Sequence, residues 1–276
     1  MMKKIISSLI AVAALGASFA FAANNTPGTG VINTSHDMRL ISGVVDPQNR
    51  VCAFCHTPHH AFQAGDVQNG GTIPTDVVYL PLWSHAITAD MTYQIYGTGI
   101  VTPFNNLGGN SPAPGGDPLY GDSRLCMSCH DGVTAMNAYY QAAIDGPASP
   151  KFMPNPGTQF NNKVIEHDLN RTHPIGFNML DVVPGQGGTY SDPGIKTLTS
   201  SSMYVGNTNA NVTIFNRLAG YVDGGNVGIL TCSTCHDVHN TLNKGINTSG
   251  GSGYFLLGSQ DGSGICLSCH TQGTGL

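Results

Sequence analysis

The hydrophobic positions of this chain form one long apolar run near its start and only short runs after it. Residues 5–19 are almost continuously apolar, follow two lysines and lead into an A-x-A sequence at residues 20–22. This order is typical of a cleaved signal peptide. No later window is apolar enough to span a bilayer. We therefore expect residues 1–22 to be removed, and an exported chain of residues 23–276 without a membrane anchor.

Beyond that run, the pattern predicts loops and few regular elements. The chain has 36 Gly and 16 Pro in 276 residues, and stretches rich in Gly, Pro and Asn read as loops at residues 105–116, 145–156 and 184–188. Strand patterns occur only at residues 212–215 and 227–230, on either side of a turn signal at 223–226. We expect this small β-hairpin to lead directly into Cys232.

Charge composition narrows the possible partners. Only 10% of the residues are charged, where about 25% is usual, and 11 Lys and Arg against 16 Asp and Glu give a net charge of −5. Such a chain has no basic surface for nucleic acid or for an anionic membrane. Its hydrophobic fraction of 40% is slightly low for a globular protein of this length, so we expect something other than aliphatic side chains to fill part of the core.

Eight cysteines in an exported chain would ordinarily indicate four disulfides. Here they form four C-x-x-C pairs, and a histidine follows each pair at once: Cys52, Cys55 and His56; Cys126, Cys129 and His130; Cys232, Cys235 and His236; Cys266, Cys269 and His270. The sequence C-x-x-C-H is the attachment signature of c-type haem, in which two thiols bind the porphyrin and the histidine binds its iron. We predict four covalently bound haem c groups.

Zinc and thioredoxin-like redox chemistry are the alternatives for C-x-x-C pairs. Ribbon-type zinc sites space their pairs by about 15–20 residues, far less than the spacing here, and zinc gives no reason for four adjacent histidines. Thioredoxin-like pairs accompany a βαβ pattern that this chain lacks. With haem, we expect a haem-organised fold of loops, short helices after the motifs and a small hairpin, wrapped around a stack of four haems.

The second axial ligand of each iron decides what the haems do. Seven histidines lie outside the motifs: His36, His59, His60, His85, His167, His173 and His239. This supply exceeds the four that are needed, and three of the nine methionines lie in the signal (Met1 and Met2) or inside a motif (Met127). We expect bis-histidine haems, with the second ligands drawn, in order of preference, from His173, His59, His239, His36 and His85. Iron closed in this way only changes oxidation state, which favours electron transfer and argues against an enzyme.

The position of His59, three residues after His56, constrains its target, and His239 follows His236 in the same way. In a helix each pair would lie on one face, whereas two axial ligands approach an iron from opposite sides. His59 and His239 therefore serve another haem or are ordinary surface residues. We hypothesise that His59 ligates a haem of the next subunit, with His36 as the competing donor, since a heterologous contact that does not close gives a filament.

The order of the motifs indicates an internal duplication. Each half has an upstream His-Asp pair, then C-x-x-C-H-x-x-H, then a bare C-x-x-C-H, from His36 to His130 and from His167 to His270. We predict one tetrahaem domain, made of two diverged two-haem modules at about residues 23–150 and 151–276.

Five segments resemble multihaem c-type cytochromes with paired C-x-x-C-H motifs, and most resemble the extracellular, filament-forming tetrahaem type (OmcE type). They are residues 52–61, 81–85, 126–132, 168–177 and 232–240, with Ser84, Thr234 and Val238 where the family pattern has Asn, Ser and Pro. The resemblance implies stacked bis-histidine haems and, in filaments, a histidine lent to a haem of the next subunit.

We therefore expect a subunit of an extracellular conductive filament for respiration to external acceptors. Its partners would be other copies of itself, head to tail, and redox proteins at the cell envelope. One alternative is a soluble periplasmic shuttle, which would more often carry a lysine-rich docking patch. Another is a nitrite or hydroxylamine reductase with one open haem. A structural surface protein with incidental haem would leave the H-x-x-H pairs without a reason.

Overall fold

The computed structural model describes residues 30–68, 71–73, 80–87, 93, 119–153, 165, 169, 172–186, 192–207, 212–220, 227–240 and 254–271. The expected signal peptide, His167, the loop at residues 105–116 and the turn at residues 223–226 lie outside these residues. No helix within the described ranges is long and apolar enough to cross a membrane.

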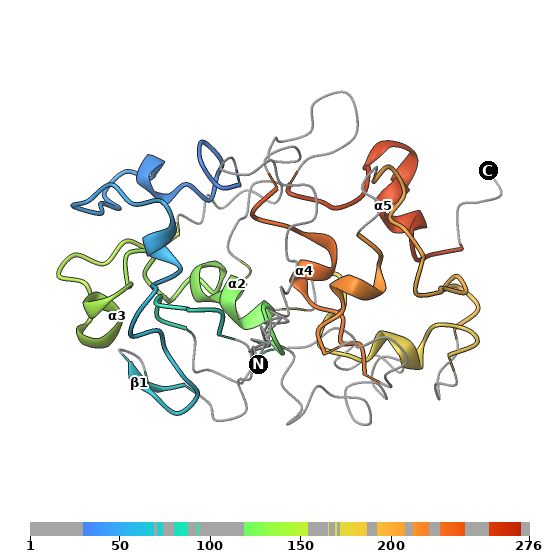
Figure 1. Ribbon diagram of the computed structural model, residues 1–276, viewed down its shortest axis with the longest axis horizontal. Coiled ribbons are helices and arrows are strands. Elements are labelled where there is room, and N and C mark those ends of the chain that lie inside the picture. Colours follow the sequence, from blue (N-terminus) through green and yellow to red (C-terminus); the bar gives the residue numbers. More distant parts are fainter. Residues whose placement is uncertain are drawn as a thin grey trace, which may run out of the picture.

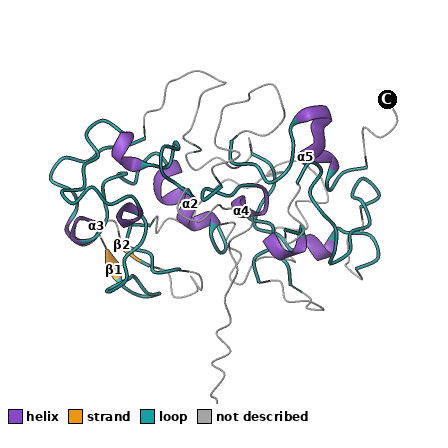
Figure 2. Cartoon of the chain, turned by 45° about the horizontal axis from the view of Figure 1, so that its top comes forward, coloured by secondary structure: helices purple, strands orange, loops and turns teal. Residues whose placement is uncertain are grey.

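Loops make up most of the described chain, and its regular elements are short (Figure 2). The α-helices are α2 (Ser123–His130), α3 (Gln141–Asp145), α4 (Cys232–Cys235) and α5 (Gly264–Leu267). The 3-10 helices are η1 (Met38–Leu40), η2 (Cys52–Phe54), η5 (Met179–Asp181), η6 (Phe215–Arg217) and η8 (Asp261–Ser263). Strand β1 (Val67–Gln68) pairs antiparallel with β2 (Gly71–Thr72), with Val67 opposite Thr72.

The helices lie over the C-x-x-C-H motifs, whereas we expected them after the motifs. In three motifs the histidine N–H donates to the carbonyl of the first cysteine, at 2.8 Å for His56, 3.0 Å for His236 and 2.9 Å for His270. This single helical turn puts positions i, i+3 and i+4 on one side. Each motif therefore presents its two thiols and its imidazole together.

The predicted hairpin before Cys232 differs from the one expected. Residues 215–217 form η6, and it is Ala219 that exchanges two hydrogen bonds of 2.9 Å with Ile229. The first predicted strand is instead part of the interior, because Val212, Ile214 and Phe215 are almost completely buried in the largest hydrophobic cluster. A run with three inward side chains in four residues lacks the alternation of a half-buried strand.

The apolar interior of the described residues consists of four separate clusters instead of one core. In Figure 1, α3 and β1 lie at one end of the long axis and α5 lies toward the other, with α2 and α4 side by side between them. The amide N–H of Cys232 in α4 donates to Ser123 Oγ in α2 at 3.1 Å. The two halves of the chain thus meet through one motif helix from each.

Candidate cofactor sites

The eight thiols are free, and neighbouring motifs bring them together in pairs. Cys55 and Cys129 pack on the same apolar cluster, and the Cys126 and Cys232 thiols are in hydrogen-bonding contact. Burial raises the pKa of Cys55, Cys129 and Cys235 to about 12, and the nearby Cys269 thiol adds to the rise at Cys235. The motifs therefore follow one another in space in their sequence order.

Tyr204 and Val205 connect the third and fourth motifs. The Tyr204 hydroxyl donates to the carbonyl of Thr234, and the Val205 N–H donates to Ser268 Oγ at 2.8 Å. Burial raises the pKa of Tyr204 well above its usual value, and the neighbouring Cys235 thiol adds to this effect. Its hydroxyl therefore remains a neutral donor between these motifs.

Three of the four motif histidines lie opposite a second imidazole. The ring centroids are 6.3 Å apart for His56 and His239, 6.3 Å for His130 and His36, and 6.2 Å for His270 and His173. A metal–imidazole bond is about 2 Å long and the nitrogen lies about 1 Å from the ring centroid, so two imidazoles on opposite sides of one metal ion have centroids about 6 Å apart. The three pairs have the spacing of two axial ligands.

Backbone carbonyls orient the ring nitrogens of these histidines. Nδ1 lies 2.7 Å from the Pro81 carbonyl in His56 and 2.8 Å from the Tyr254 carbonyl in His236. A carbonyl only accepts, so each Nδ1 carries the proton and Nε2 has the lone pair. This is the usual arrangement around a metal-binding histidine, in which the second hydrogen bond fixes the tautomer.

The same surroundings favour neutral imidazoles. Burial lowers the pKa of His56 and of His173, and the facing imidazoles, His239 and His270, lower these values further. Burial also lowers the pKa of His236, with a further contribution from His130. Neutral imidazole is the form that binds a metal ion.

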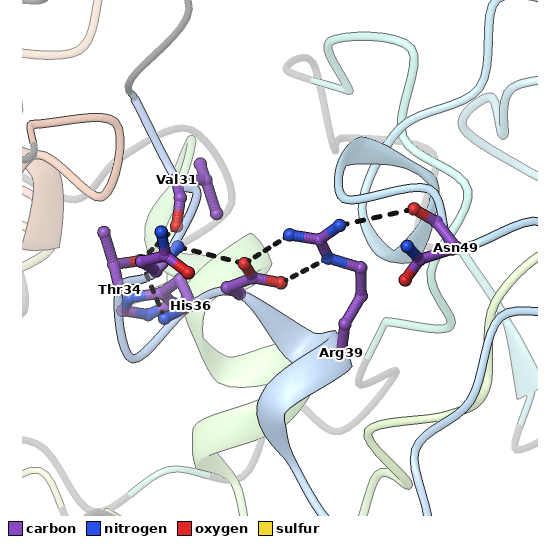
Figure 3. A network of polar contacts seen from close by, with 7 residues as sticks. Val31, Thr34, His36, Arg39 and Asn49 are labelled. Carbon is purple, nitrogen blue, oxygen red and sulfur yellow. Dashed lines mark hydrogen bonds and ion pairs between the residues drawn. The ribbon is translucent and has the colours of Figure 1, made fainter.

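Polar contacts of the first loop hold His36 in place (Figure 3). The His36 N–H donates to Thr34 Oγ1 at 3.1 Å, and that hydroxyl donates to the Val31 carbonyl at 2.6 Å. The buried Asp37 carboxylate accepts from the Asn33 N–H at 3.0 Å and forms an ion pair of 2.7 Å with Arg39. The His36 ring packs edge-on against Phe255 with centroids 4.8 Å apart, so the other half of the chain also positions it.

His85, the last of the predicted ligands, has a different environment. It is completely buried, with Nδ1 2.7 Å from the Ala86 carbonyl and Nε2 3.2 Å from the Met136 carbonyl. Its ring also contacts Trp83, at 6.5 Å between centroids. Burial lowers the pKa of His85, and a neutral imidazole donates from one nitrogen only, so Nδ1 donates to Ala86 while Nε2 lies beside the Met136 carbonyl and 3.7 Å from Cys129 Sγ. Unlike the three pairs above, His85 lies opposite no motif imidazole among the described residues.

Three of the described histidines remain: the motif histidine His236, and His59 and His60 after the first motif. Among the residues that the structure describes, no second imidazole faces His236 at the spacing of the three pairs, although His130 is near enough to lower its pKa. His59 and His60 are exposed, and His60 has a left-handed backbone with φ of 58°. The segment after His56 is not helical, so the helical geometry assumed for His56 and His59 does not apply. His239 nevertheless faces His56, the histidine of a different motif.

The backbone around the first motif is held by the segment at residues 81–84. Thr57 N–H donates to the Leu82 carbonyl at 2.8 Å, and Ser84 N–H donates to the Cys55 carbonyl at 2.9 Å. Leu82 has φ of 54°, a left-handed conformation that is rare for a branched residue. Together with the bond to His56 Nδ1, these contacts form a short clamp on the motif.

The third motif has the same clamp. Asp237 N–H donates to the Phe255 carbonyl at 2.8 Å, and Leu257 N–H donates to the Cys235 carbonyl at 2.8 Å. Phe255 has φ of 60°, a left-handed backbone like that of Leu82 in the first half. The clamp residues have little sequence in common, and our sequence analysis did not identify residues 254–257. Identical bonding in the two halves supports the predicted duplication.

Within the described residues, no three or more His, Cys, Asp or Glu side chains converge on a position for a bare metal ion. The paired histidines and the cysteines beside them instead fit the donor set of c-type haem. The sequence matches no protein-family model. Among curated proteins, none shows significant sequence similarity to it.

Proposed function

We propose that this protein transfers electrons through four c-type haems. The observation that carries the proposal is the separation of 6.2–6.3 Å between three motif histidines and three distant histidines. Nothing in the apolar packing requires the same separation three times between residues so far apart in sequence, whereas axial ligation of one iron does.

The chain would hold each group with two cysteines and two histidines. His56 and His239 would serve the first site, His130 and His36 the second, and His270 and His173 the fourth. Bound haem supplies a one-electron change between ferric and ferrous iron. The paired histidines would hold the iron from both sides and exclude substrate, and the Nδ1 bonds to Pro81 and Tyr254 would leave Nε2 with the lone pair that binds a metal.

The order of the motifs supports conduction along the molecule. Cys55 and Cys129 pack on one apolar cluster, the Cys126 and Cys232 side chains are hydrogen-bonded, and Cys269 is close enough to raise the pKa of Cys235, so each site is a neighbour of the next in sequence. A linear row of four sites has an entry at one end and an exit at the other, which suits a conduit better than a single reaction centre.

The site of His236 supports assembly into a filament. His239 in the second half faces His56 in the first half, so the second half supplies a ligand to the module before it. The residue equivalent to His239 in the first half is His59, which is exposed. The same relation, continued beyond the chain, makes His59 of one subunit the second ligand for the His236 site of the preceding subunit. His36 lies against His130 of its own chain, which argues against it as the competing donor.

The lack of a second imidazole facing His236 among the described residues also favours one other function. A multihaem reductase for nitrite or hydroxylamine needs one haem with an open position, and the third site would provide it in a monomer. The state of assembly therefore decides between a conduit and a reductase.

The test compares His59→Ala with His60→Ala in the purified, haem-loaded protein. We expect both variants to retain four haems. His59→Ala should shorten or abolish the fibres seen by electron microscopy and convert one haem in four to high-spin, whereas His60→Ala should leave both unchanged. Fibres of normal length with an unaltered spectrum from His59→Ala would refute the role of His59. A wild-type monomer whose high-spin haem binds nitrite would support the reductase.

A further inference from the structure

We propose that the joint between consecutive subunits repeats the joint between α2 and α4 inside the chain, with residues 261–267 of one copy packed on residues 51–54 of the next. The proposal rests on the proposed filament and deepens it by naming the two surfaces. Its partner is a second copy of this chain.

The internal joint has a defined structure. Ser123 at the start of α2 is completely buried, and its Oγ accepts from the Cys232 N–H at 3.1 Å. The side chains of Cys126 and Cys232 are hydrogen-bonded to each other. The joint is also tight, because a Cβ added at Gly121 would lie 3.2 Å from Ala219 Cβ.

Each component of this joint has a counterpart in the opposite half. Ser263 precedes Cys266 by three residues, as Ser123 precedes Cys126. The hydroxyl two residues after the first cysteine donates within its own turn in both segments, from Ser268 to Gly264 at 3.0 Å and from Ser128 to Leu125 at 2.6 Å. The segment of η8 and α5 is therefore the equivalent of α2. The two segments differ at their start, where Gly262 and Ser263 have positive φ and α2 is helical.

The equivalent of α4 is η2, since the first and third motifs share the same clamp. In α4 the residue before the first cysteine is Thr231, which is buried in the joint, and in η2 the corresponding residue is Val51. Joining the α5 segment to η2 would therefore place Ser263 against the Cys52 N–H of the next copy.

Exposure identifies these two surfaces as unpaired. Cys52 and Cys266 are exposed, whereas the other six cysteines, including Cys126 and Cys232, are partly covered. Ser263 is exposed, in contrast to its buried counterpart Ser123. In Figure 1, η2 (light blue) lies in the half of the molecule that holds α3 and β1, and α5 lies toward the other end, so the contact is head to tail and is not made within one chain.

The joint agrees with the ligand relation between the halves. Within the chain, the contact between α2 and α4 accompanies the approach of His239 to His56. Between copies, the same contact would accompany the approach of His59 to His236. One repeated operation thus accounts both for the two exposed surfaces and for His59 and His236, neither of which faces a second imidazole at the spacing of about 6 Å among the described residues.

Photo-crosslinking of the full-length, haem-loaded protein tests the joint. Benzoylphenylalanine at Val51, whose backbone is right-handed helical, would be irradiated in fibres grown from a mixture of ¹⁴N- and ¹⁵N-labelled subunits. We expect crosslinks between differently labelled chains at residues 261–267. The probe at Val133, which is 62% exposed, is the control and should not reach that segment.

A charge at the other surface gives an independent measurement. Ser263 has φ of 60°, which Asp tolerates, so Ser263→Asp should keep four haems. It should raise the protein concentration needed for fibres about tenfold or more, because burying a charged carboxylate costs more hydration than one hydrogen bond from the Cys52 N–H replaces. Normal fibres from Ser263→Asp, or fibres in which Val51 crosslinks only elsewhere, would overturn the joint and leave the filament intact. A wild-type protein that stays monomeric would overturn the filament and the joint together, without affecting the proposal of haem electron transfer.

Discussion

The ring of His239 lies 6.3 Å from the ring of His56, with their planes 28° from parallel, although the two residues belong to opposite halves of the chain. His239 comes from the loop after the third motif, and His56 closes the first. The pair therefore has two roles. In the proposed function it would supply both histidine ligands of one iron, and it brings a residue of each half together near the contact between α2 and α4.

Mass spectrometry of the exported protein tests the number of attached groups. We expect the intact mass to exceed that of the polypeptide from Ala23 by four haems, because each of the four motifs has two free thiols beside a histidine. The double variant Cys126→Ala, Cys129→Ala should lose one of the four. Three or fewer haems in the wild type, or bound zinc, would contradict the assignment.

Substitution of the distant histidines tests the second ligands. His36→Ala, His173→Ala and His239→Ala should each leave four attached haems and turn one in four high-spin, because a thioether does not depend on the sixth ligand. Electron paramagnetic resonance of the oxidised protein measures that fraction. Added imidazole should restore the low-spin signal.

His85→Ala is the informative control for this set. Both of its nitrogens face backbone carbonyls, so we expect the low-spin signal to persist while stability falls by about 1–3 kcal/mol, as is usual when buried polar groups lose a partner. A high-spin haem in His85→Ala would place His85 among the ligands after all.

The ion pair between Asp46 and Arg50 should make stability depend on pH. The Arg50 guanidinium lies 2.6 Å from Asp46 Oδ1 and holds the pKa of that buried carboxyl well below its usual value. A lowered folded pKa contributes stability that is present above the unfolded pKa of about 3.9 and is lost as the pH falls through the folded value. We expect urea denaturation midpoints to fall below about pH 4.

Asp46→Asn should remove part of that dependence and lower stability at pH 7 by about 1–3 kcal/mol, since Arg50 and the Tyr139 hydroxyl lose a charged acceptor. Asp66→Asn, at an exposed carboxylate, should change stability by less than about 0.5 kcal/mol. Equal effects of the two substitutions would mean that the ion pair contributes nothing specific.

The left-handed backbone at Leu82 gives a prediction about the clamp on the first motif. Its side chain is 57% exposed, so Leu82→Gly should be neutral or stabilising, because glycine adopts positive φ without strain. Leu82→Val should destabilise the protein by about 1–2 kcal/mol, since a β-branched residue is strained there. Thermal unfolding of the pair measures the order, and a more stable Val variant would refute the argument.

Local chemistry was readable in the sequence because it depends on close spacing. The two thiols and the imidazole of each motif lie within five residues, so one helical turn brings them together. The positions of His36 and His173 were also predictable as candidates, because the supply of histidines is small. The motif that each histidine faces was not predictable, because it depends on contacts between residues of opposite halves, such as the contact of Phe255 with His36.

The errors have the same origin. The strand predicted at residues 212–215 is buried on both sides, and its neighbours decide this rather than its own pattern. The surroundings of His85 could not be predicted from its own segment either, because the Met136 carbonyl and the Cys129 thiol beside its Nε2 come from another part of the chain. The clamp at residues 254–257 was missed because it is made of backbone bonds, which almost any side chains permit.

The approach of His239 to His56 also affects how the second ligands would depend on protein concentration. Taken alone, each half would have one histidine to donate and one motif histidine without a second imidazole. Because both halves belong to one polypeptide, the pair of His239 and His56 forms within the chain and is independent of protein concentration. A pair of His59 and His236 between copies would instead be lost on dilution.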